Sequence, residues 1–401
     1  MIEIRRINAD EVIDSDKISV IAFHGRHDFN KQESPDPNAD PCDWTWGAFE
    51  GGKIVSRMTE IPYVMRFDGH DTKMSGIGGV ATLPESRKGG KVRQIFEALL
   101  AGAYADGVVF SCLAPFSHQF YRRYGYELCC TRREMRIPVH ELGKYKYSGS
   151  ITQIFPGDDT ASLQTIHETY ISGINHAIKR GAPPESNDWP YFIKHDPYKT
   201  GAFVYLWRDG AGVPRSYLKY QHKRNSDGGS EIEIRELMFI DREALHAQLS
   251  FIGGLSAEVK ELIWIAPDFI DPADFVDVAW VVKQKLIPQD MTRIVNVKAA
   301  LELMRRPEGD GSYVIETEDE IIPGNNGRWL VEFGVEGSRV AATRKDADLT
   351  CELTALAQLI TGYRSLDSLA LTSRQRFEIR NNKSLLRRVF TPRPQHLTEN
   401  F

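Results

Sequence analysis

A basic turn with two adjacent glycines, at residues 87–93, constrains the fold of this chain more than any other feature. The short apolar run 78–83 before the turn predicts a β-strand. After the turn, apolar residues from 92 to 103 recur at the i, i+3, i+4, i+7 spacing of one helical face. A second apolar run follows at 108–113. The order strand, helix, strand implies a right-handed crossover between two parallel strands, and therefore an α/β layered domain.

Two hairpin signals upstream make the predicted sheet of this domain mixed. The turns Gly51-Gly52 and Asp68-Gly69 each follow a strand-like run and predict antiparallel hairpins. Further strands are expected at the N-terminus and within residues 127–139. We expect this first domain to span residues 1–148.

The remaining chain predicts two more domains, in keeping with its length of 401 residues. Residues 149–288 repeat the strand, helix, strand order and predict a second copy of the first architecture. The tetrapeptide Phe-Ile-Asp-Arg at 239–242 stands where the basic turn would be, so a second phosphate site is not expected. Residues 289–401 mix short strands with helices and predict a C-terminal α+β domain.

The basic turn has the composition of an anion-binding site. A helix N-terminus leaves backbone N–H groups unpaired and carries partial positive charge. Glycines before it let a ligand approach the backbone, and nearby cationic side chains add full charges. A pyrophosphate group suits such a site. The cationic side chains of the turn are Arg87, Lys88, Lys91 and Arg93.

Three phosphate-binding motifs compete for this turn. A P-loop needs Ser or Thr after its lysine, whereas Val92 follows Lys91. The dinucleotide fingerprint Gly-x-Gly-x-x-Gly is absent from the turn. The acyl-CoA pattern Arg/Gln-x-x-Gly-x-Gly/Ala fits at Arg87 and Gly90 and departs from its last position at Val92. A solvated basic turn remains the alternative to all three.

Composition excludes several other classes of function. The formal net charge of -5 gives no drive toward nucleic acid or an anionic membrane. The sequence shows no apolar run of about 18 residues and no signal peptide. Its five cysteines include no Cys-x-x-Cys pair, which favours reduced thiols and a cytoplasmic location. The histidines are scattered, so no metal site is expected.

With these motifs placed, the chain resembles the GNAT acetyltransferases, and among them the Eis-like (enhanced intracellular survival) enzymes. The resemblance rests on the turn with its flanking elements, on the motif Phe-Tyr-x-x-Tyr-Gly-Tyr at 120–126, on the segment 291–301 and on the chain end at Phe401. It implies a catalytic GNAT domain, a second GNAT-like domain and a C-terminal sterol-carrier-like domain. It also implies acetyl-CoA as co-substrate and assembly into homo-oligomers, as hexamers.

The resemblance assigns roles to individual residues. Backbone groups of Val80, Ala81 and Thr82 would bind the pantetheine arm as an added strand. Phe116 and Ser117 would contact the CoA from the other side. The pyrophosphate would be held by seven consecutive residues, which are Arg87, Lys88, Gly89, Gly90, Lys91, Val92 and Arg93.

The resemblance also implies the two groups that move protons. Tyr121 would be the general acid, and the α-carboxylate of Phe401 would be the general base. Without the resemblance, a packed aromatic with a solvated hydroxyl is the favoured interpretation of Tyr121, and a frayed terminus is the alternative for Phe401. His118 is a competing acid or base, although a packed histidine is the simpler interpretation. For Tyr124 and Tyr126 we predict packing in the core.

The acceptor is an amine by this resemblance, and multi-amine small molecules such as aminoglycosides are the first candidates. The region 28–46 is acidic and includes Phe29, Trp44 and Trp46, which would suit a cationic ligand. A solvated loop followed by a strand is the alternative for this region. Two other functions stay open: a protein lysine acetyltransferase, and a lipid or sterol carrier that uses the C-terminal domain.

Overall fold

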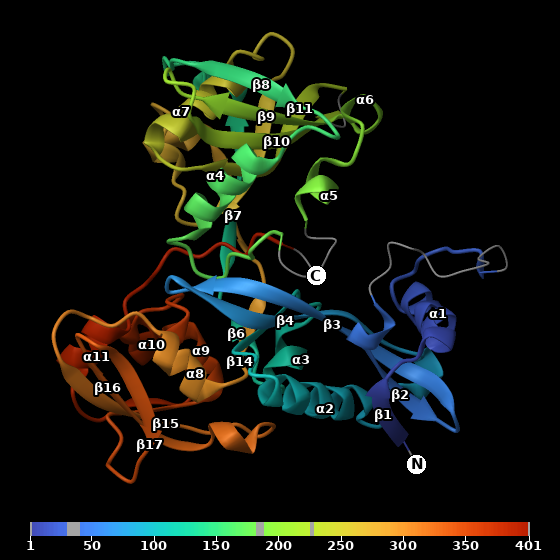
Figure 1. Ribbon diagram of the computed structural model, residues 1–401, viewed down its shortest axis with the longest axis vertical. Coiled ribbons are helices and arrows are strands. Elements are labelled where there is room, and N and C mark those ends of the chain that lie inside the picture. The colour runs from blue at the N-terminus through green and yellow to red at the C-terminus, as the bar shows by residue number, and fades with distance from the viewer. Residues whose placement is uncertain (1, 30–40, 182–187, 225–227, 400–401) are drawn as a thin grey trace. The chain divides into compact units, whose positions relative to one another are not determined.

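The structure is a computed structural model that describes residues 2–29, 41–181, 188–224 and 228–399. Three β-sheets organise the chain, two of seven strands and one of five (Figure 1). The chain divides into two compact units. The first unit combines Met1–Cys129 with Asp290–Arg393, and the second combines Cys130–Gln289 with Pro394–Thr398.

The first sheet is mixed, as the hairpin signals predicted. Its strands β4 and β5 are parallel, and its remaining neighbours are antiparallel. In spatial order its strands are β1 (Ile2–Arg6), β2 (Thr45–Glu50), β3 (Lys53–Phe67), β4 (His70–Thr82), β5 (Phe110–Leu113), β14 (Met291–Ile294) and β6 (Glu127–Leu128).

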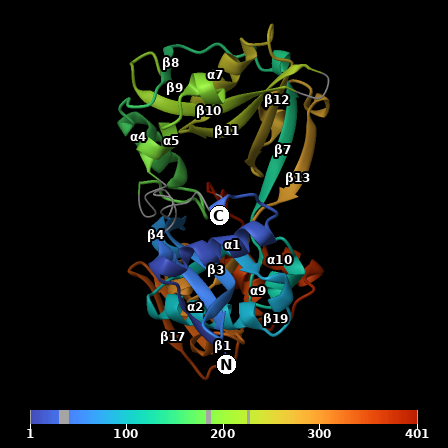
Figure 2. The ribbon, with the colours of Figure 1, turned by 90° about the vertical axis from the view of Figure 1, so that its right-hand side faces the viewer.

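Helices cover both faces of this sheet (Figure 2). The crossover helix α2 (Lys91–Ala105) buries the predicted apolar stripe, and the short helix α3 (His118–Arg122) joins the same cluster. Helix α1 (Val12–Ala22) contributes to a separate cluster. Ala48 packs in the α2 cluster and the next residue, Phe49, in the α1 cluster, as the alternation of strand side chains requires.

The second sheet repeats the strand order of the first, which confirms the predicted second copy. Its parallel pair β11 and β12 is joined by helix α7 (Arg242–Gly253). Helices α4 (Ala161–Ile171), α5 (Trp189–Ile193) and α6 (Pro197–Thr200) precede the sheet's central strands in sequence. In spatial order the strands are β13 (Lys283–Pro288), β7 (Thr131–Pro138), β12 (Glu261–Pro267), β11 (Ser230–Phe239), β10 (Pro214–Arg224), β9 (Ala202–Arg208) and β8 (Ser150–Ile154).

The two α/β domains exchange one strand each. Strand β7 was expected in the first sheet and lies in the second, between β12 and β13. Strand β14, expected at the start of the third domain, lies in the first sheet between β5 and β6. The chain therefore passes from the first compact unit to the second between residues 129 and 130, and back between residues 289 and 290. The expected domain boundaries, at 148 and 288, follow the order of the chain and do not include this exchange of strands.

The third domain is an α+β layer in the first compact unit. Its helices are α8 (Val297–Leu303), α9 (Leu353–Ile360), α10 (Leu366–Thr372) and α11 (Lys383–Val389). Every residue of α9 is buried, and Gln358 Nε2 on that helix donates to the Leu128 carbonyl of β6 at 2.8 Å. The five-stranded sheet has the order β17 (Gly337–Ala342), β16 (Gly327–Gly334), β15 (Gly311–Thr317), β18 (Leu349–Cys351) and β19 (Phe377–Ile379).

A buried ion pair joins the third domain to the exchanged strand. The Arg293 guanidinium of β14 binds both carboxylate oxygens of Asp319, at 2.6 and 2.8 Å, and each side chain is 1% exposed. Arg293 Nη1 also donates to the Tyr124 carbonyl at 2.5 Å. Burial raises the pKa of Asp319, but the charge of Arg293 and its hydrogen bonds outweigh that effect and hold the pKa below its ordinary value. Both groups therefore stay charged.

Gly125 makes room for this guanidinium. Its φ of +81° lies in the left-handed region. A Cβ atom at this position would lie 1.8 Å from Arg293 Nη1. The glycine of the 120–126 motif is thus required twice, by its backbone conformation and by the approach of Arg293.

We expect Gly125→Ala to lower the free energy of unfolding by about 3–5 kcal/mol, since it adds φ strain and displaces one partner of a buried ion pair. Gly52→Ala is the matched control, because Gly52 has a φ of +79° and open space around its Cβ position. The control variant should lose only the free energy that alanine costs in a left-handed backbone conformation, roughly 1–2 kcal/mol. Urea unfolding measures both variants, and equal losses would show that the Arg293 contact contributes nothing.

Candidate active site

Strands β4 and β5 pair over only part of their length, which opens a notch in the first sheet. The parallel pairing runs from Met74 opposite Phe110 to Ile77 opposite Leu113. Strand β5 ends there, while β4 continues along β3 to Thr82. Gly79, with a φ of +57°, lies where β4 continues alone, beside a register shift against β3. In the described chain, no strand pairs with the second edge of β4 beyond Ile77.

Alternation along β4 decides which backbone groups face this unpaired edge. The N–H of Leu83 donates to the Val55 carbonyl of β3 at 3.0 Å, so the backbone groups of Thr82 point the opposite way, to the open edge. The carbonyl of Ala81 is engaged instead, since it accepts from Ser56 Oγ at 2.9 Å. Of the three predicted pantetheine contacts, Thr82 therefore faces the open edge and Ala81 faces β3, while Val80 lies in the register shift, where alternation does not fix its direction.

The basic turn leads directly into an uncapped helix N-terminus. Three consecutive residues have positive φ: Lys88 at +65°, Gly89 at +128° and Gly90 at +72°. Gly90 is the N-cap of α2 and supplies no side chain to the first turn. The N–H of Gln94 donates to the Gly90 carbonyl at 3.0 Å, so the three N–H groups of residues 91–93 precede the first helical bond. This geometry suits an anionic ligand.

The four cationic side chains of the turn differ in their surroundings. Arg87 and Lys88 are exposed and form no hydrogen bond or ion pair with any residue the structure describes. Lys91 is buried: its Nζ donates to the Ser86 carbonyl at 3.0 Å and pairs with Glu50 at 2.9 Å. We expected this ammonium to contact the ligand. In the structure it binds two groups of the protein, the Ser86 carbonyl and the Glu50 carboxylate, and so stabilises the turn.

The fourth cation, Arg93, is exposed on the first turn of α2. It pairs with Glu97 one helical turn later, at 2.8 Å. The φ of +128° at Gly89 is what requires a glycine there, since a Cβ atom would only touch Lys91 Nζ at 3.4 Å. The charge available to a ligand therefore comes mainly from Arg87, Lys88 and the helix N-terminus.

Tyr121 lies on α3, in the same packed cluster as α2. Its ring is 3% exposed and packs edge-to-face against Phe96, Phe116 and Phe120, with centroids 6.3, 5.4 and 5.1 Å away. Its hydroxyl forms no hydrogen bond to a described residue, and protein atoms do not fully enclose it. Burial, with a smaller contribution from Tyr124, raises the pKa of Tyr121 above its ordinary value. The phenol therefore keeps its proton at neutral pH.

The neighbours of Tyr121 divide into surface and core residues. Phe116 is 72% exposed beside it, so its ring is open to a ligand. The Ser117 hydroxyl caps α3 by accepting from the Phe120 N–H at 3.3 Å, which gives that side chain a structural role in place of the expected contact. Tyr124 stacks on Phe96, and Tyr126 binds Ser111 Oγ at 2.7 Å, which confirms the predicted core packing of both.

Two further polar groups lie on or beside α3: Glu127, which the sequence did not single out, and His118, which was considered there as a competing acid or base. Glu127 is buried and binds the guanidinium of Arg122 through both oxygens, at 2.7–3.0 Å. It also accepts from Gln375 Nε2 of the third domain at 2.6 Å. His118 Nε2 is enclosed without a hydrogen-bond partner in the described ranges, and burial lowers the His118 pKa, so its ring is neutral near pH 7.

Some of the expected site lies outside the described residues, namely Phe401 and, in the acidic region, Glu33, Asp36 and Asp40. Trp46 is described and belongs to the core. Its Nε1 donates to Glu60 at 3.0 Å, and the Arg6 guanidinium lies 4.5 Å from its ring centroid. These contacts engage the ring that we had considered for a cationic acceptor.

The corresponding helix of the second domain, α7, is capped by a carboxylate of its own chain. Asp241 is the N-cap of α7, where its Oδ1 accepts from the Ala244 N–H at 2.8 Å. The Asp241 carboxylate also pairs with Arg215. A carboxylate thus takes the place that a phosphate would need, which explains physically why no second phosphate site was expected.

Comparison with known proteins agrees with this arrangement. Residues 3–129 match the profile of an acetyltransferase (GNAT) domain, residues 185–294 that of another acetyltransferase (GNAT) domain, and residues 297–398 that of a sterol carrier protein domain. An uncharacterised N-acetyltransferase of Streptomyces avermitilis is 22% identical over 364 residues, which cover 83% of this chain and 82% of that protein.

Two solved structures share the whole fold. A conserved protein of unknown function from Enterococcus faecalis V583, described as a probable N-acyltransferase, has a TM-score of 0.84 at 22% identity, with 100% of both chains covered. Eis1 from Mycobacterium abscessus has a TM-score of 0.80 at 17% identity, again with 100% of both chains covered. These two structures show the shared fold. The domain matches and the Streptomyces relative show an N-acetyltransferase with two GNAT domains and a sterol carrier protein domain.

In the described ranges, no group of three or more His, Cys, Asp or Glu side chains is arranged to hold a metal ion. No helix among the described residues has both the length and the apolarity to cross a membrane.

The double variant Arg87→Ala/Lys88→Ala tests the anion site. We expect about 10-fold weaker binding of CoA and a smaller dependence of that affinity on salt, because two exposed charges near the phosphates are lost. Calorimetric titration at two salt concentrations measures both effects. The exposed pair Arg344→Ala/Lys345→Ala removes the same two charges in the third domain and is the control. Equal affinities in both variants would place the phosphates elsewhere.

Proposed function

We propose that the protein is an Eis-like, acetyl-CoA-dependent N-acetyltransferase that acts on multi-amine small molecules such as aminoglycosides. The observation that carries the proposal is the continuity of the unpaired edge of β4 with the uncapped N-terminus of α2. An extended pantetheine arm fits the first and a pyrophosphate fits the second. We further propose a cytoplasmic homo-oligomer, a hexamer by the resemblance.

In the proposed reaction the acetyl group passes directly from sulfur to nitrogen. The unprotonated acceptor amine attacks the thioester carbonyl, a C–N bond forms and the C–S bond breaks. Backbone N–H groups at the open edge near Val80 and Thr82 would polarise the carbonyl oxygen. The thiolate that leaves takes the proton of the Tyr121 hydroxyl, and the amine releases its own proton to a base. Placement of the two reactants supplies much of the acceleration.

Tyr121 suits the acid role because burial keeps it protonated. A phenol with a raised pKa is a weak acid in the resting enzyme. Transfer to the thiolate is uphill at equilibrium, because a thiol has a lower ordinary pKa than a phenol, about 8.5 against about 10. The hydrogen bond from Tyr121 strengthens as negative charge develops on sulfur, which is the stage at which a general acid acts. The exposed ring of Phe116, 5.4 Å from Tyr121 between centroids, would border the thioester.

The base in this proposal is the α-carboxylate of Phe401. A terminal carboxylate has an ordinary pKa of about 3.3–3.7, so it is ionised at neutral pH and attracts cationic amines. Partial burial beside aromatic residues would raise that pKa and strengthen the base.

A lipid-carrier function is not favoured by the third domain. The space among α8, α11 and its sheet, lined by Leu301, Tyr313, Phe333 and Val389 among others, measures about 10 Å³. That volume holds roughly one water molecule, and a larger hollow of about 440 Å³ in the same unit is lined by charged groups such as Arg305, Arg306 and Glu308, so neither suits a lipid tail. Acetylation of protein lysines remains the alternative outcome of an acceptor screen.

We expect Tyr121→Phe to lower kcat by roughly 10²–10³-fold, because the proton donor is lost. CoA affinity should survive, since the ring and its packing remain. Turnover is measured as thiol release from acetyl-CoA with kanamycin or tobramycin. Tyr124→Phe, in the same motif, is the control and should keep kcat near that of the wild type. Equal turnover of the two variants would remove Tyr121 from the acid role, and no turnover of any amine by the wild type would end the proposed function.

Blocking the C-terminal carboxylate tests the base. Two alanines added after Phe401 should lower kcat by at least about 100-fold, because the carboxylate is moved from its position. Phe401→Leu keeps the carboxylate and should retain most of the activity, and the same two alanines at the N-terminus control for the addition itself. A fully active extended enzyme would show that another group takes the proton.

A further inference from the structure

The helix that carries Tyr121 is too short to hold its own position. Helix α3 has five residues, well below the roughly 12 that an isolated helix needs to be stable in water. The Ser117 hydroxyl caps its start. Its direction and its rotation about its own axis must therefore come from contacts with the surrounding protein.

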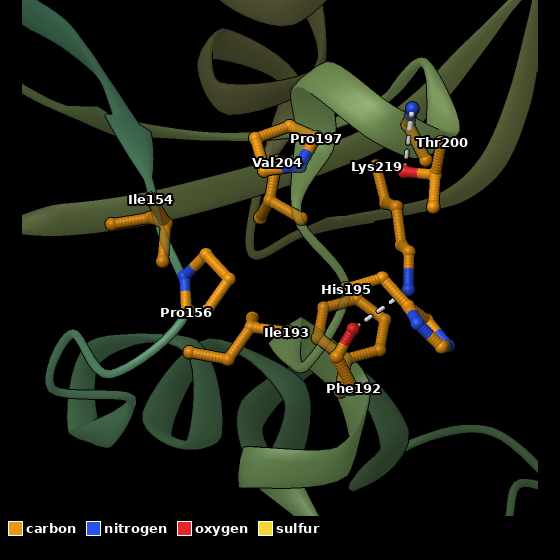
Figure 3. A pocket seen from close by; sticks show the side chains of 10 residues that line it. Ile154, Pro156, Phe192, Ile193, His195, Pro197, Thr200, Val204 and Lys219 are labelled. Atoms are coloured by element: carbon orange, nitrogen blue, oxygen red, sulfur yellow. Dashed lines mark hydrogen bonds between the residues drawn. The ribbon is translucent and has the colours of Figure 1, made fainter.

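A short helix of the second domain shows how such a contact works. Helix α5 also has five residues, and it borders a hollow of about 60 Å³ in that domain. Lys219 of strand β10 anchors this helix. Its Nζ donates to the Phe192 carbonyl at 2.7 Å and lies 4.2 Å from the centre of the Phe192 ring (Figure 3). One long polar side chain from a neighbouring strand thus holds a five-residue helix.

The anchor of α3 is its last residue, Arg122. The Arg122 guanidinium binds both carboxylate oxygens of Glu127. The Glu127 side chain is 3% exposed, and its Oε1 also accepts from the Leu128 N–H at 2.9 Å. Because Tyr121 and Arg122 are neighbours in one short helix, this ion pair sets how α3 is rotated about its axis.

The third domain completes the anchor. Gln375, in the loop between α10 and β19, donates from Nε2 to Glu127 Oε2 at 2.6 Å. The Ser373 hydroxyl donates to Gln375 Oε1 at 2.9 Å and accepts from the Gln375 N–H at 3.1 Å. The amide is therefore held with its NH₂ group toward Glu127. The loop itself is fixed, since the Arg376 N–H donates to the Glu352 carboxylate at 2.9 Å.

We propose that Gln375 of the third domain is a positioning residue for Tyr121. It acts through Glu127 and Arg122, whose ion pair fixes the rotation of α3. This inference rests on the proposed function, in which Tyr121 is the general acid. A tyrosine hydroxyl lies roughly 9 Å from the axis of its helix, so a rotation of about 6° moves it by about 1 Å. A displacement of that size can cost up to about 100-fold in rate.

The proposal gives the third domain a part in catalysis that needs no lipid. Two other residues of this domain support the chain just after Tyr121. Asp319 holds the arginine that binds the Tyr124 carbonyl. Leu353 of α9 lies beside Gly125, where a Cβ atom would be 3.3 Å from the Leu353 Cδ2. The surroundings of the proposed acid are thus built largely from the C-terminal third of the sequence.

The experiment compares Gln375→Met with Gln358→Met. The first variant keeps the length of the side chain and removes the donor to Glu127. The second removes the donor to the Leu128 carbonyl, and so controls for a general loosening between the third domain and strand β6. The readouts are kcat, KM for acetyl-CoA, CoA affinity and hydrogen exchange of the Gly125 amide, which donates to the Arg122 carbonyl at 3.0 Å.

We expect Gln375→Met to lower kcat by roughly 10-fold and to speed exchange of the Gly125 amide. CoA affinity and KM for acetyl-CoA should not change, because the acid is misplaced and the CoA site is not. Gln358→Met should leave kcat and exchange near wild type. Gln375→Lys keeps a donor and should restore most of kcat. Gln375→Glu should lose more than Gln375→Met, since two carboxylates would face each other.

A double variant shows whether Gln375 acts through the Tyr121 hydroxyl. In a Tyr121→Phe background the acid is already absent, so adding Gln375→Met should lower kcat no further. Three results would overturn the positioning role: a further 10-fold loss in the double variant, an equal loss of kcat in Gln358→Met, or wild-type kcat in Gln375→Met.

Failure of the proposed function gives a different result. If Tyr121→Phe keeps full turnover while the Gly125 amide of Gln375→Met exchanges quickly, the anchor exists but Tyr121 is not the acid, and the positioning role is lost with it. Exchange is measured without substrate, so it tests the anchor even if no amine is acetylated. An unchanged Gly125 amide in Gln375→Met would then show that Gln375 does not hold α3.

Discussion

The pairing of Arg293 with Asp319 is the interaction on which the first compact unit depends. Arg293 lies on a strand that the sequence places after the second domain, yet its guanidinium supports the Tyr124 carbonyl, three residues from Tyr121. Asp319 in turn accepts the N–H groups of Ile321 and Ile322, so the pair also orders the loop between β15 and β16 of the third domain. Both charges are almost completely removed from water, so neither partner is tolerable without the other. The environment of the proposed acid is thus set by residues nearly 200 positions away in sequence.

The two α/β domains show how one architecture takes different roles by changing one helix N-terminus. In the first, Gly90 leaves the N–H groups of α2 unsatisfied, and exposed cations stand beside them. In the second, Asp241 satisfies the first turn of α7 with its own carboxylate. The sheets keep the same strand order, so the difference in function is local and chemical.

The sequence predicted elements that depend on local pattern and missed those that depend on partners. The crossover through α2 followed from apolar spacing and a glycine turn, and the structure confirms it. The destinations of β7 and β14 could not be predicted, because a strand's alternation says which face is buried but not which sheet it joins. The same limit applies to side chains. The sequence predicted that Lys91 contacts the ligand, but it could not show that Glu50 of β2 forms an ion pair with its ammonium. Likewise, it could not show that the Ser117 hydroxyl caps α3. The proton-transfer roles of Tyr121 and Phe401 remain predictions.

Strand exchange also has a consequence for the order of events during synthesis. The edge of β5 stays uncovered until β14 has left the ribosome, some 180 residues later. At ordinary translation rates of about 5–20 residues per second, the first domain waits roughly 9 to 36 s with an apolar strand edge open to pairing with other chains. The catalytic sheet is therefore completed only after the second domain has been made. Nascent chains that stop within the second domain would carry an unfinished first domain and would be natural targets for chaperones.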